Sequence, residues 1–372
     1  MAGSSPRARG NRVLVAMSGG VDSSVAAALL QEAGYDVAGV TMKLWGGPSD
    51  TGCCSVSDVD DARWVADQLG IEHHVFNFGD DFERHVVEPY VADHAAGRTP
   101  NPCVECNRHI KFSRLLRRAD ALGFGLVATG HHARIVDGPG GPRLARGVDE
   151  AKDQSYVLHM LDAALLARLL LPVGETTKDE VRREAEARGL VTARKPDSQD
   201  VCFITASAGR RKFLGRRIPM SPGRLVDSSG AELGTVEALE LVTVGQRRGL
   251  GAIGGGSPRY VLDVDAESST VTVGSRAELD SEITPLEDWR WTDGPVDGPV
   301  RVQTSAHGAA EAATVDRAGA AVRWAEPRRR VAPGQSVVAY QGDIVVGGGT
   351  AASVAGGSGE ALFSHVLTLH PP

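Results

Sequence analysis

The sequence lacks any apolar run long enough to cross a membrane. A spanning helix needs about 20 consecutive apolar residues, and the hydrophobic residues, 42% of the chain, are interrupted throughout by polar ones. Residues 1–12 are polar and basic and contain no apolar stretch of the kind found in secretory signals. We therefore expect a cytoplasmic protein with no membrane partner.

Cysteine is scarce, and its five occurrences do not form the pattern of a disulfide framework. Their number is odd, and they lie in a few short segments instead of being spread along the chain, which favours a reducing compartment. The five are Cys53, Cys54, Cys103, Cys106 and Cys202. This arrangement predicts reactive thiols more than structural disulfides.

An excess of positive charge is also absent, because the formal net charge is −7. That balance does not indicate nucleic acid binding, although local patches can still bind phosphate. Basic clusters occur in the second half of the chain, at 210–212, 216–217, 247–248 and 328–330. Each cluster is typical of solvated surface, and together they are a weak indication of an RNA partner.

A glycine-containing segment near the start of the chain lacks the lysine of kinase-type phosphate loops. An apolar run leads into SGGVDS (18–23) and then into helix-favouring residues, which predicts a strand, a tight turn and a helix. N–H groups at a helix start attract phosphate. The segment resembles the pyrophosphate-binding loop of the ATP-pyrophosphatases, which implies ATP as a substrate; Asp22 is a candidate Mg²⁺ ligand. The alternative is an ordinary glycine turn.

The first part of the chain, 1–205, predicts an α/β domain with a parallel sheet covered by helices. The strands expected after the first are 36–42, 71–77 and 126–129. Ligands of such sheets bind beyond the carboxyl ends of the strands. Ser18, Met42 and Gly130 all fall at such ends.

Glycine, proline and short β-rich runs replace helices after about residue 205. Residues 223–234 and 259–274 each predict a hairpin, within a small β-rich domain at 206–280. The remainder, 281–372, has the short strands and glycine turns of a small β-barrel. We expect the glycines of 345–349 to form a tight turn in that barrel.

Cys103 and Cys106 form a CxxC pair at a predicted loop-to-helix junction, and Cys202 lies in DSQDVCFI (197–204). A thiol near a helix start gains thiolate character from the helix dipole, which favours Cys106 as a nucleophile. Half of a zinc site is one alternative, although only the vicinal Cys53 and Cys54 offer a second pair. An iron–sulfur cluster on Cys103, Cys106 and Cys202 is another. We interpret Cys53 and Cys54 as buried thiols without an assigned role.

Taken in order, several motifs resemble those of the tRNA 2-thiouridylase family, which places sulfur on the wobble uridine of tRNA. They are AMSGGVDSS (16–24), GRTPNPCVECNRHIKF (97–112), ATGHHAR (128–134), KDQSY (152–156), DSQDVCFI (197–204), VGQRRGLG (244–251) and PGQSVVAY (333–340). The resemblance covers nearly the whole chain. It implies an adenine-nucleotide α-hydrolase-like domain, a small β-rich domain and a C-terminal β-barrel.

The resemblance also implies roles for individual residues. Cys106, in CNxxIKF, would be the nucleophile, and Cys202, in DSxxxCFI, would carry the persulfide. The residues that would bind ATP are Ala16, Met17, Ser18, Gly19, Gly20, Val21, Asp22, Ser23, Met42 and Gly130. Those that would contact tRNA or its target base are Asn101, Pro102, Cys103, His131, Lys152, Asp153, Gln154 and Gln335. Many members have Asp where this chain has Cys103, so an acid–base role at that position is in doubt.

The expected activity is ATP-dependent 2-thiolation of uridine. Adenylylation turns the C2 oxygen into a leaving group, and a persulfide then delivers sulfur. The resemblance implies tRNA and a sulfur-donor protein, a cysteine desulfurase or a sulfur relay protein, as partners. Two alternatives remain: another ligase with the same loop, which needs no paired thiols, and a non-catalytic nucleotide- or tRNA-binding module.

Overall fold

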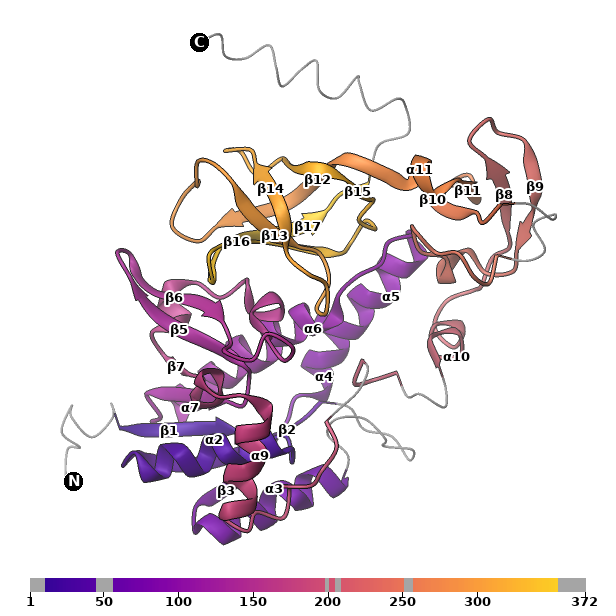
Figure 1. Ribbon diagram of the computed structural model, residues 1–372. Helices are drawn as coiled ribbons and strands as arrows, with labels where there is room; N and C mark the ends of the chain where they lie inside the picture. The colour runs from indigo at the N-terminus through magenta and orange to yellow at the C-terminus, as the bar shows by residue number, and fades with distance from the viewer. Residues whose placement is uncertain (1–10, 45–55, 198–200, 205–208, 251–256, 354–372) are drawn as a thin grey trace.

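A computed structural model describes residues 11–44, 56–197, 201–204, 209–250 and 257–353. Figure 1 shows an N-terminal α/β domain, a C-terminal barrel above it and a central β-sheet beside the barrel. The order is the one expected from the sequence. Within the described residues, no helix is long and apolar enough to cross a membrane.

The N-terminal domain is built on a five-stranded parallel sheet in the order β3-β2-β1-β4-β7. Its strands are β1 (Arg12–Ala16), β2 (Asp36–Lys43), β3 (Glu72–Asn77), β4 (Leu126–Thr129) and β7 (Leu169–Leu170). The chain moves outward from β1 to β3 and then returns to the other side of β1 with β4. The carboxyl ends of β1 and β4 therefore flank a switch point, where ligands of open α/β sheets bind.

Helices cover both faces of this sheet. The side chains of β1 therefore alternate between two hydrophobic cores, one on each face. Val13 and Val15 face α2 (Val21–Glu32), α3 (Val56–Leu69) and α9 (Lys178–Ala187). Leu14 and Ala16 face the other layer. That layer contains α4 (Gly79–Phe82), η1 (Glu83–Val87), α5 (Glu88–Ala95), α6 (Pro102–Glu105), η2 (Cys106–Arg114) and α7 (Leu115–Ala121). The predicted α/β class is confirmed.

The central sheet has four strands in the order β10-β11-β8-β9. They are β8 (Gly223–Asp227), β9 (Glu232–Val236), β10 (Tyr260–Asp265) and β11 (Thr270–Gly274), so both predicted hairpins are present. The short helices α10 (Gly209–Gly215), η5 (Leu239–Leu241) and α11 (Arg276–Leu279) border it.

The C-terminal barrel closes through pairing of β12 with both β15 and β17. Its strands are β12 (Asp280–Trp291), β13 (Val300–Gln303), β14 (Glu311–Val315), β15 (Ala321–Arg329), β16 (Ser336–Gln341) and β17 (Ile344–Ala351). The hairpin of β5 (Ala133–Gly138) and β6 (Gly141–Arg146) belongs to the first domain, yet it extends the barrel sheet by pairing Ala145 with Ile344. The two domains thus share a sheet.

The expected turn at 345–349 is wrong, because these residues lie inside β17. Their glycines are required by close packing. A Cβ on Gly347 would lie 2.8 Å from the Trp289 ring, and one on Gly349 would lie 2.9 Å from the Glu287 carbonyl oxygen. Glycine in a strand therefore marks a close approach by another chain segment at these positions.

The remaining short elements connect the domains. They are η3 (Ser155–Leu158), α8 (Ala163–Leu166) and η4 (Pro172–Glu175). η3 contributes Tyr156 and Leu158 to the core that also contains Tyr340 and Val345 of the barrel. The N-terminal domain and the barrel are therefore joined by a continuous apolar core.

Candidate active site

The SGGVDS loop lies between β1 and α2, as expected. Gly19 has a φ of 73°, which glycine adopts without strain. Gly20 is the N-cap of α2 and has no side chain to cap it, so the N–H groups of the first turn face outward for an anion. The Ser23 hydroxyl accepts from the Ser18 N–H at 3.2 Å and donates to the Gly20 carbonyl at 3.1 Å.

Gly130 completes the loop from the neighbouring strand end. A Cβ at this position would lie 2.5 Å from the Ser23 nitrogen and 2.6 Å from the Asp22 carbonyl carbon. Any larger residue would push the phosphate loop away from β4. The structure thus gives a packing reason for glycine at a position that the sequence placed beside the nucleotide.

Asp22 is held by two residues from other segments. Lys178, at the start of α9, donates to both carboxylate oxygens at 2.7 Å, and His132 Nε2 lies 3.1 Å from Oδ1. Burial raises the pKa of Asp22, but the hydrogen bonds from His132 and Lys178 outweigh it and leave the pKa below its usual value. Asp22 is therefore a carboxylate at neutral pH.

Lys178 is the functional candidate that the sequence interpretation missed. Lys178 is 8% exposed, and its Nζ also lies 2.9 Å from Asp197 Oδ1. The capping box of Thr177 and Glu180 was visible in the sequence and is confirmed. A lysine directly after such an N-cap was the available signal, but Asp22 lies far away in the sequence and nothing local links Lys178 to Asp197.

Asp197 joins the nucleotide loop to the segment that contains Cys202. Besides Lys178, it accepts from Lys152 at 2.9 Å and from Arg182 at 2.7 Å. Burial raises the pKa of Asp197, but the hydrogen bonds from Lys152 and Lys178 dominate and lower the pKa to about 2. The start of the DSQDVCFI segment is thus held by three cations, one of which, Lys178, also contacts Asp22.

The CxxC segment lies in the first turns of a helical stretch. Asn101 is the N-cap, and its side chain accepts from the Cys103 N–H at 3.2 Å. Cys103 is exposed, whereas Cys106 is buried and begins the π-helical segment η2. The backbone N–H of Cys106 already bonds within the helix, so Cys106 lies one turn inside the helix start instead of at it.

Cys202 is half-buried beside an aromatic cluster. Phe203, the next residue, packs with ring centroids 5.3 Å from Tyr90 and 5.0 Å from Phe213. Cys106 belongs to the same apolar cluster, against which Cys202 packs. The two cysteines predicted to react are therefore placed on one side of the parallel sheet.

The barrel holds the loop that precedes Cys106. Gln335 Nε2 donates to the Thr99 carbonyl at 2.6 Å, and the Thr99 N–H donates to the Pro333 carbonyl at 2.7 Å. The Tyr156 hydroxyl donates to the Ser336 carbonyl at 2.8 Å. The PGQSVVAY and KDQSY motifs, distant in sequence, thus meet at the entry to the CxxC helix.

The other predicted site residues differ in how accessible they are. Met42 lies at the carboxyl end of β2 and is 9% exposed. Burial lowers the pKa of His131 well below its usual value, and its Nδ1 lies 2.7 Å from the Thr129 hydroxyl. The Asp153 side chain is 3% exposed and accepts from Arg146, and Gln154 Oε1 accepts from the His132 N–H. Asp153 and Gln154 therefore shape the site from within, and Lys152 is the exposed member of the trio.

No group of three or more His, Cys, Asp or Glu residues suited to a metal ion occurs among the described residues. Cys103, Cys106 and Cys202 accordingly do not converge as ligands of a cluster in this conformation. Cys53 and Cys54 lie outside the described residues, so the zinc alternative that depends on them stays a prediction.

Most of the basic clusters are engaged with the protein itself. Arg210 donates to the Leu241 carbonyl, Arg217 lies over the Phe213 ring at 4.2 Å, and Arg330 donates to the Leu262 carbonyl. Arg247 and Arg248 instead lie exposed on the loop before Gly249. That pair is the best candidate for an RNA phosphate contact among the clusters.

Comparison with known proteins agrees with these motifs. Three family models match in order: a tRNA methyl transferase HUP domain at 11–206, a tRNA methyl transferase PRC-barrel domain at 211–275 and an aminomethyltransferase β-barrel domain at 282–351. A tRNA-specific 2-thiouridylase MnmA from Chloroflexus aggregans is 50% identical over 91% of this chain and 97% of its own length. One from Mycobacteroides abscessus is 48% identical over 90% and 98%.

Among solved structures, the chain is similar to the U34-tRNA thiolase NcsA from Methanococcus maripaludis with its [4Fe-4S] cluster. The similarity is 21% in sequence, covers 52% of this chain and 62% of that one, and has a TM-score of 0.34, so nothing is inferred from it. The sequence relatives are sufficient: by identity over almost its full length, the chain belongs to the tRNA-specific 2-thiouridylase family.

Proposed function

We propose that this protein adenylylates the C2 oxygen of the wobble uridine of tRNA and replaces that oxygen with sulfur from a persulfide on Cys202. The observation that carries the proposal is the chain of contacts from Asp22 through Lys178 to Asp197. It connects the loop suited to ATP phosphates with the segment that bears Cys202. Family membership supports the reaction class.

In the first step, the uridine O2 attacks the α-phosphorus of ATP and pyrophosphate leaves. The N–H groups at the start of α2 and the Ser18 hydroxyl supply donors for the phosphates. Lys178 and Lys152 supply positive charge at the edge of the same loop. Because the new C2–O–AMP bond has a good leaving group, the carbon becomes open to attack.

Asp22 is the residue of this site that would hold Mg²⁺. The carboxylate lies beside the phosphate loop, but both of its oxygens now accept from Lys178. A bound metal ion would neutralise phosphate charge, and Asp22 would hold it once Lys178 turned toward the phosphates. Within the protein, Lys178 balances the Asp22 charge while ATP is absent.

In the second step, the terminal sulfur of the Cys202 persulfide attacks C2 and AMP leaves. The Cys106 thiolate then attacks Cys202 Sγ, which releases 2-thiouridine and leaves a Cys106–Cys202 disulfide. A cellular thiol must reduce that disulfide before the next turnover. Burial of Cys106 and partial burial of Cys202 support this order of events, because water is kept from the persulfide and from the activated base.

The proposal requires two macromolecular partners in the cytoplasm. The first is tRNA with its target base unstacked, since a base inside a helix cannot reach a buried cysteine. Asn101, Pro102 and Cys103 at the helix entry are the proposed contacts of that base, with Gln335 supporting them from the barrel. The second partner is a sulfur-donor protein, a desulfurase or a relay protein, that loads Cys202.

The test is whether tRNA triggers the release of AMP and pyrophosphate from ATP. With a cognate tRNA transcript and a sulfur donor that loads Cys202 we expect both products, and with Asp22→Ala neither; without the donor, pyrophosphate alone should be released. If ADP appeared instead of AMP, the proposed cleavage of ATP between its α and β phosphates would be wrong. If AMP formed without tRNA, the protein would be another ligase of this loop class. The same conclusion would follow if the double variant Cys106→Ala with Cys202→Ala released AMP at the parental rate. Binding without cleavage would indicate a non-catalytic module.

A further inference from the structure

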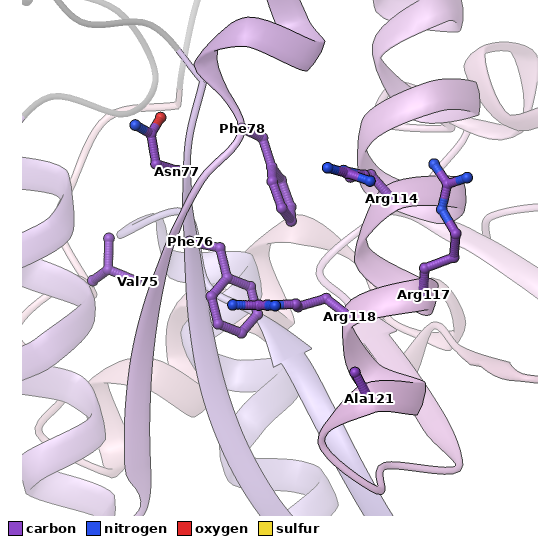
Figure 2. A pocket seen from close by; sticks show the side chains of 8 residues that line it. All are labelled: Val75, Phe76, Asn77, Phe78, Arg114, Arg117, Arg118 and Ala121. Carbon is purple, nitrogen blue, oxygen red and sulfur yellow. The ribbon is translucent and has the colours of Figure 1, made fainter.

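A groove of about 490 Å³ lies between β3 and the helix formed by η2 and α7, outside the site described above. Figure 2 shows Phe76 and Phe78 on the strand side and three arginines on the helix side, with Arg118 reaching across to Phe76. β3 is the edge strand of the parallel sheet, so no further strand of the described sheet covers this side. The groove is therefore open along the sheet edge.

Two aromatic rings line the strand side of the groove, Phe76 near the end of β3 and Phe78 just after it. Their centroids are 6.0 Å apart, and the His74 ring, two residues before Phe76, is stacked 6.1 Å from it at an interplanar angle of 11°. Phe78 is buried, whereas Phe76 is only partly buried. Phe76 is therefore the ring of the groove on which a base can stack.

The rim of the groove carries concentrated positive charge on an otherwise acidic chain. Arg114, Arg117 and Arg118 have the spacing that places side chains on one helix surface. Arg114 pairs with Asp81 at 2.8 Å, and the Arg118 guanidinium lies 5.1 Å from the Phe76 ring centroid. Arg117 is exposed and forms no ion pair or ring contact within the described part of the chain. Its guanidinium is available to a phosphate.

We infer that this aromatic–arginine groove binds a nucleotide that flanks the target base of the RNA substrate. The helical stretch from Pro102 to Ala121 runs from the proposed nucleophile to the groove. At about 1.5 Å per residue, Arg117 lies about 16 Å along it from Cys106, a few nucleotides from the target base. Stacking of a base on Phe76 and a phosphate contact with Arg117 would hold the RNA along this helical stretch. This inference depends on the proposed function for its RNA.

The test measures tRNA binding by fluorescence anisotropy over a salt series. Arg117→Ala should weaken binding and reduce the slope of log K against log salt by about 0.7 to 0.9, the contribution of one phosphate. Phe76→Leu keeps an apolar floor but removes the stacking ring, so it should weaken binding about 5- to 150-fold and leave the slope unchanged. The two variants therefore report separate contacts.

Arg317→Ala is the matched control, because Arg317 is an exposed arginine of the barrel whose partner Asp297 already neutralises it. It should change neither affinity nor slope. Circular dichroism of each variant excludes unfolding. If the parent protein binds no tRNA, the proposed function fails. If the parent binds tRNA and both groove variants match it at every salt concentration, the groove inference is overturned. If those variants then lost only sulfur transfer from the donor protein, the groove would be assigned to a protein partner.

Discussion

Lys178 Nζ lies 2.7 Å from each carboxylate oxygen of Asp22, and the same ammonium lies 2.9 Å from Asp197. One buried cation thus neutralises a carboxylate of the phosphate loop and another at the start of the Cys202 segment. An entering phosphate would compete for that cation. A bound phosphate would therefore change the charge balance at both carboxylates, although Asp197 keeps Lys152 and Arg182 as partners.

Lys178→Met should reduce tRNA-dependent pyrophosphate release by about 100- to 1000-fold, the range for removing one charge-stabilising donor. The reason is that phosphate charge loses its cation at the edge of the loop. Lys178→Arg should retain part of the activity, because it keeps the charge with altered geometry. A pyrophosphate-release assay compares the three proteins.

Removing one partner of a buried ion pair can also unfold a protein. The control is Lys178→Met with Asp22→Asn, in which the carboxylate left without its cation is gone, while Asp197 keeps Lys152 and Arg182 as partners. We expect this double variant to be as thermally stable as the parent within a few degrees and still inactive. If Lys178→Met alone released pyrophosphate at the parental rate, Lys178 would have only a structural role.

Gly130→Ala should raise the KM for ATP, because its Cβ would clash with the backbone of Asp22 and Ser23. Overpacking of this kind costs about 1–3 kcal/mol, and here the loop is what must move. Gly215→Ala in α10 is the control, since its nearest neighbour would be Met220 at 3.8 Å. ATP titrations that gave the same KM for Gly130→Ala and the parent would remove Gly130 from the nucleotide site.

Asp197→Asn should lose stability at neutral pH but not at strongly acidic pH. The folded protein lowers the pKa of Asp197 from 3.8 to about 2, so its contribution is complete above about pH 4 and disappears as the pH falls through about 2. Urea unfolding of parent and variant from pH 7 to 2 measures the difference, which should shrink over that interval. A difference that stayed constant with pH would mean that Asp197 contributes no charge-dependent stability.

The turn at SGGVDS between β1 and α2 and the strand ends could be predicted from the sequence because they are local. SGGVDS specifies its own turn, and Met42 and Gly130 follow apolar strands directly. The capping box at Thr177 is equally local. The family and the three-part fold follow from motifs of this kind, and both are confirmed.

Relationships between distant segments could not be predicted in this way. Nothing near Lys178 in the sequence indicates that it will meet Asp22 and Asp197. The pairing of Ala145 with Ile344 depends on how two domains pack. The glycines of β17 do not form the expected turn, because the residues that require them, Trp289 and His159, come from distant segments.

Charge reversal of the exposed pair, Arg247→Glu with Arg248→Glu, should weaken tRNA binding and flatten its salt dependence, because phosphate contacts release counterions. Arg210→Glu is unsuitable for this purpose, since Arg210 donates to the Leu241 carbonyl and its loss would disturb packing. Arg317→Glu changes the charge elsewhere on the surface and controls for net charge. Superimposable salt titrations of the pair variant and the parent would make 247–248 ordinary solvated surface.

Nucleoside mass spectrometry of tRNA treated with the single cysteine variants tests the central claim most directly. We predict that Cys202→Ser forms neither a protein persulfide nor 2-thiouridine, and that Cys106→Ser loads persulfide on Cys202 but makes no 2-thiouridine. Cys103→Ser, at the exposed position of the CxxC pair, should retain at least partial activity. If Cys103→Ser is inactive and loses bound iron, or if Cys106→Ser still makes 2-thiouridine, the persulfide mechanism with Cys106 and Cys202 is contradicted.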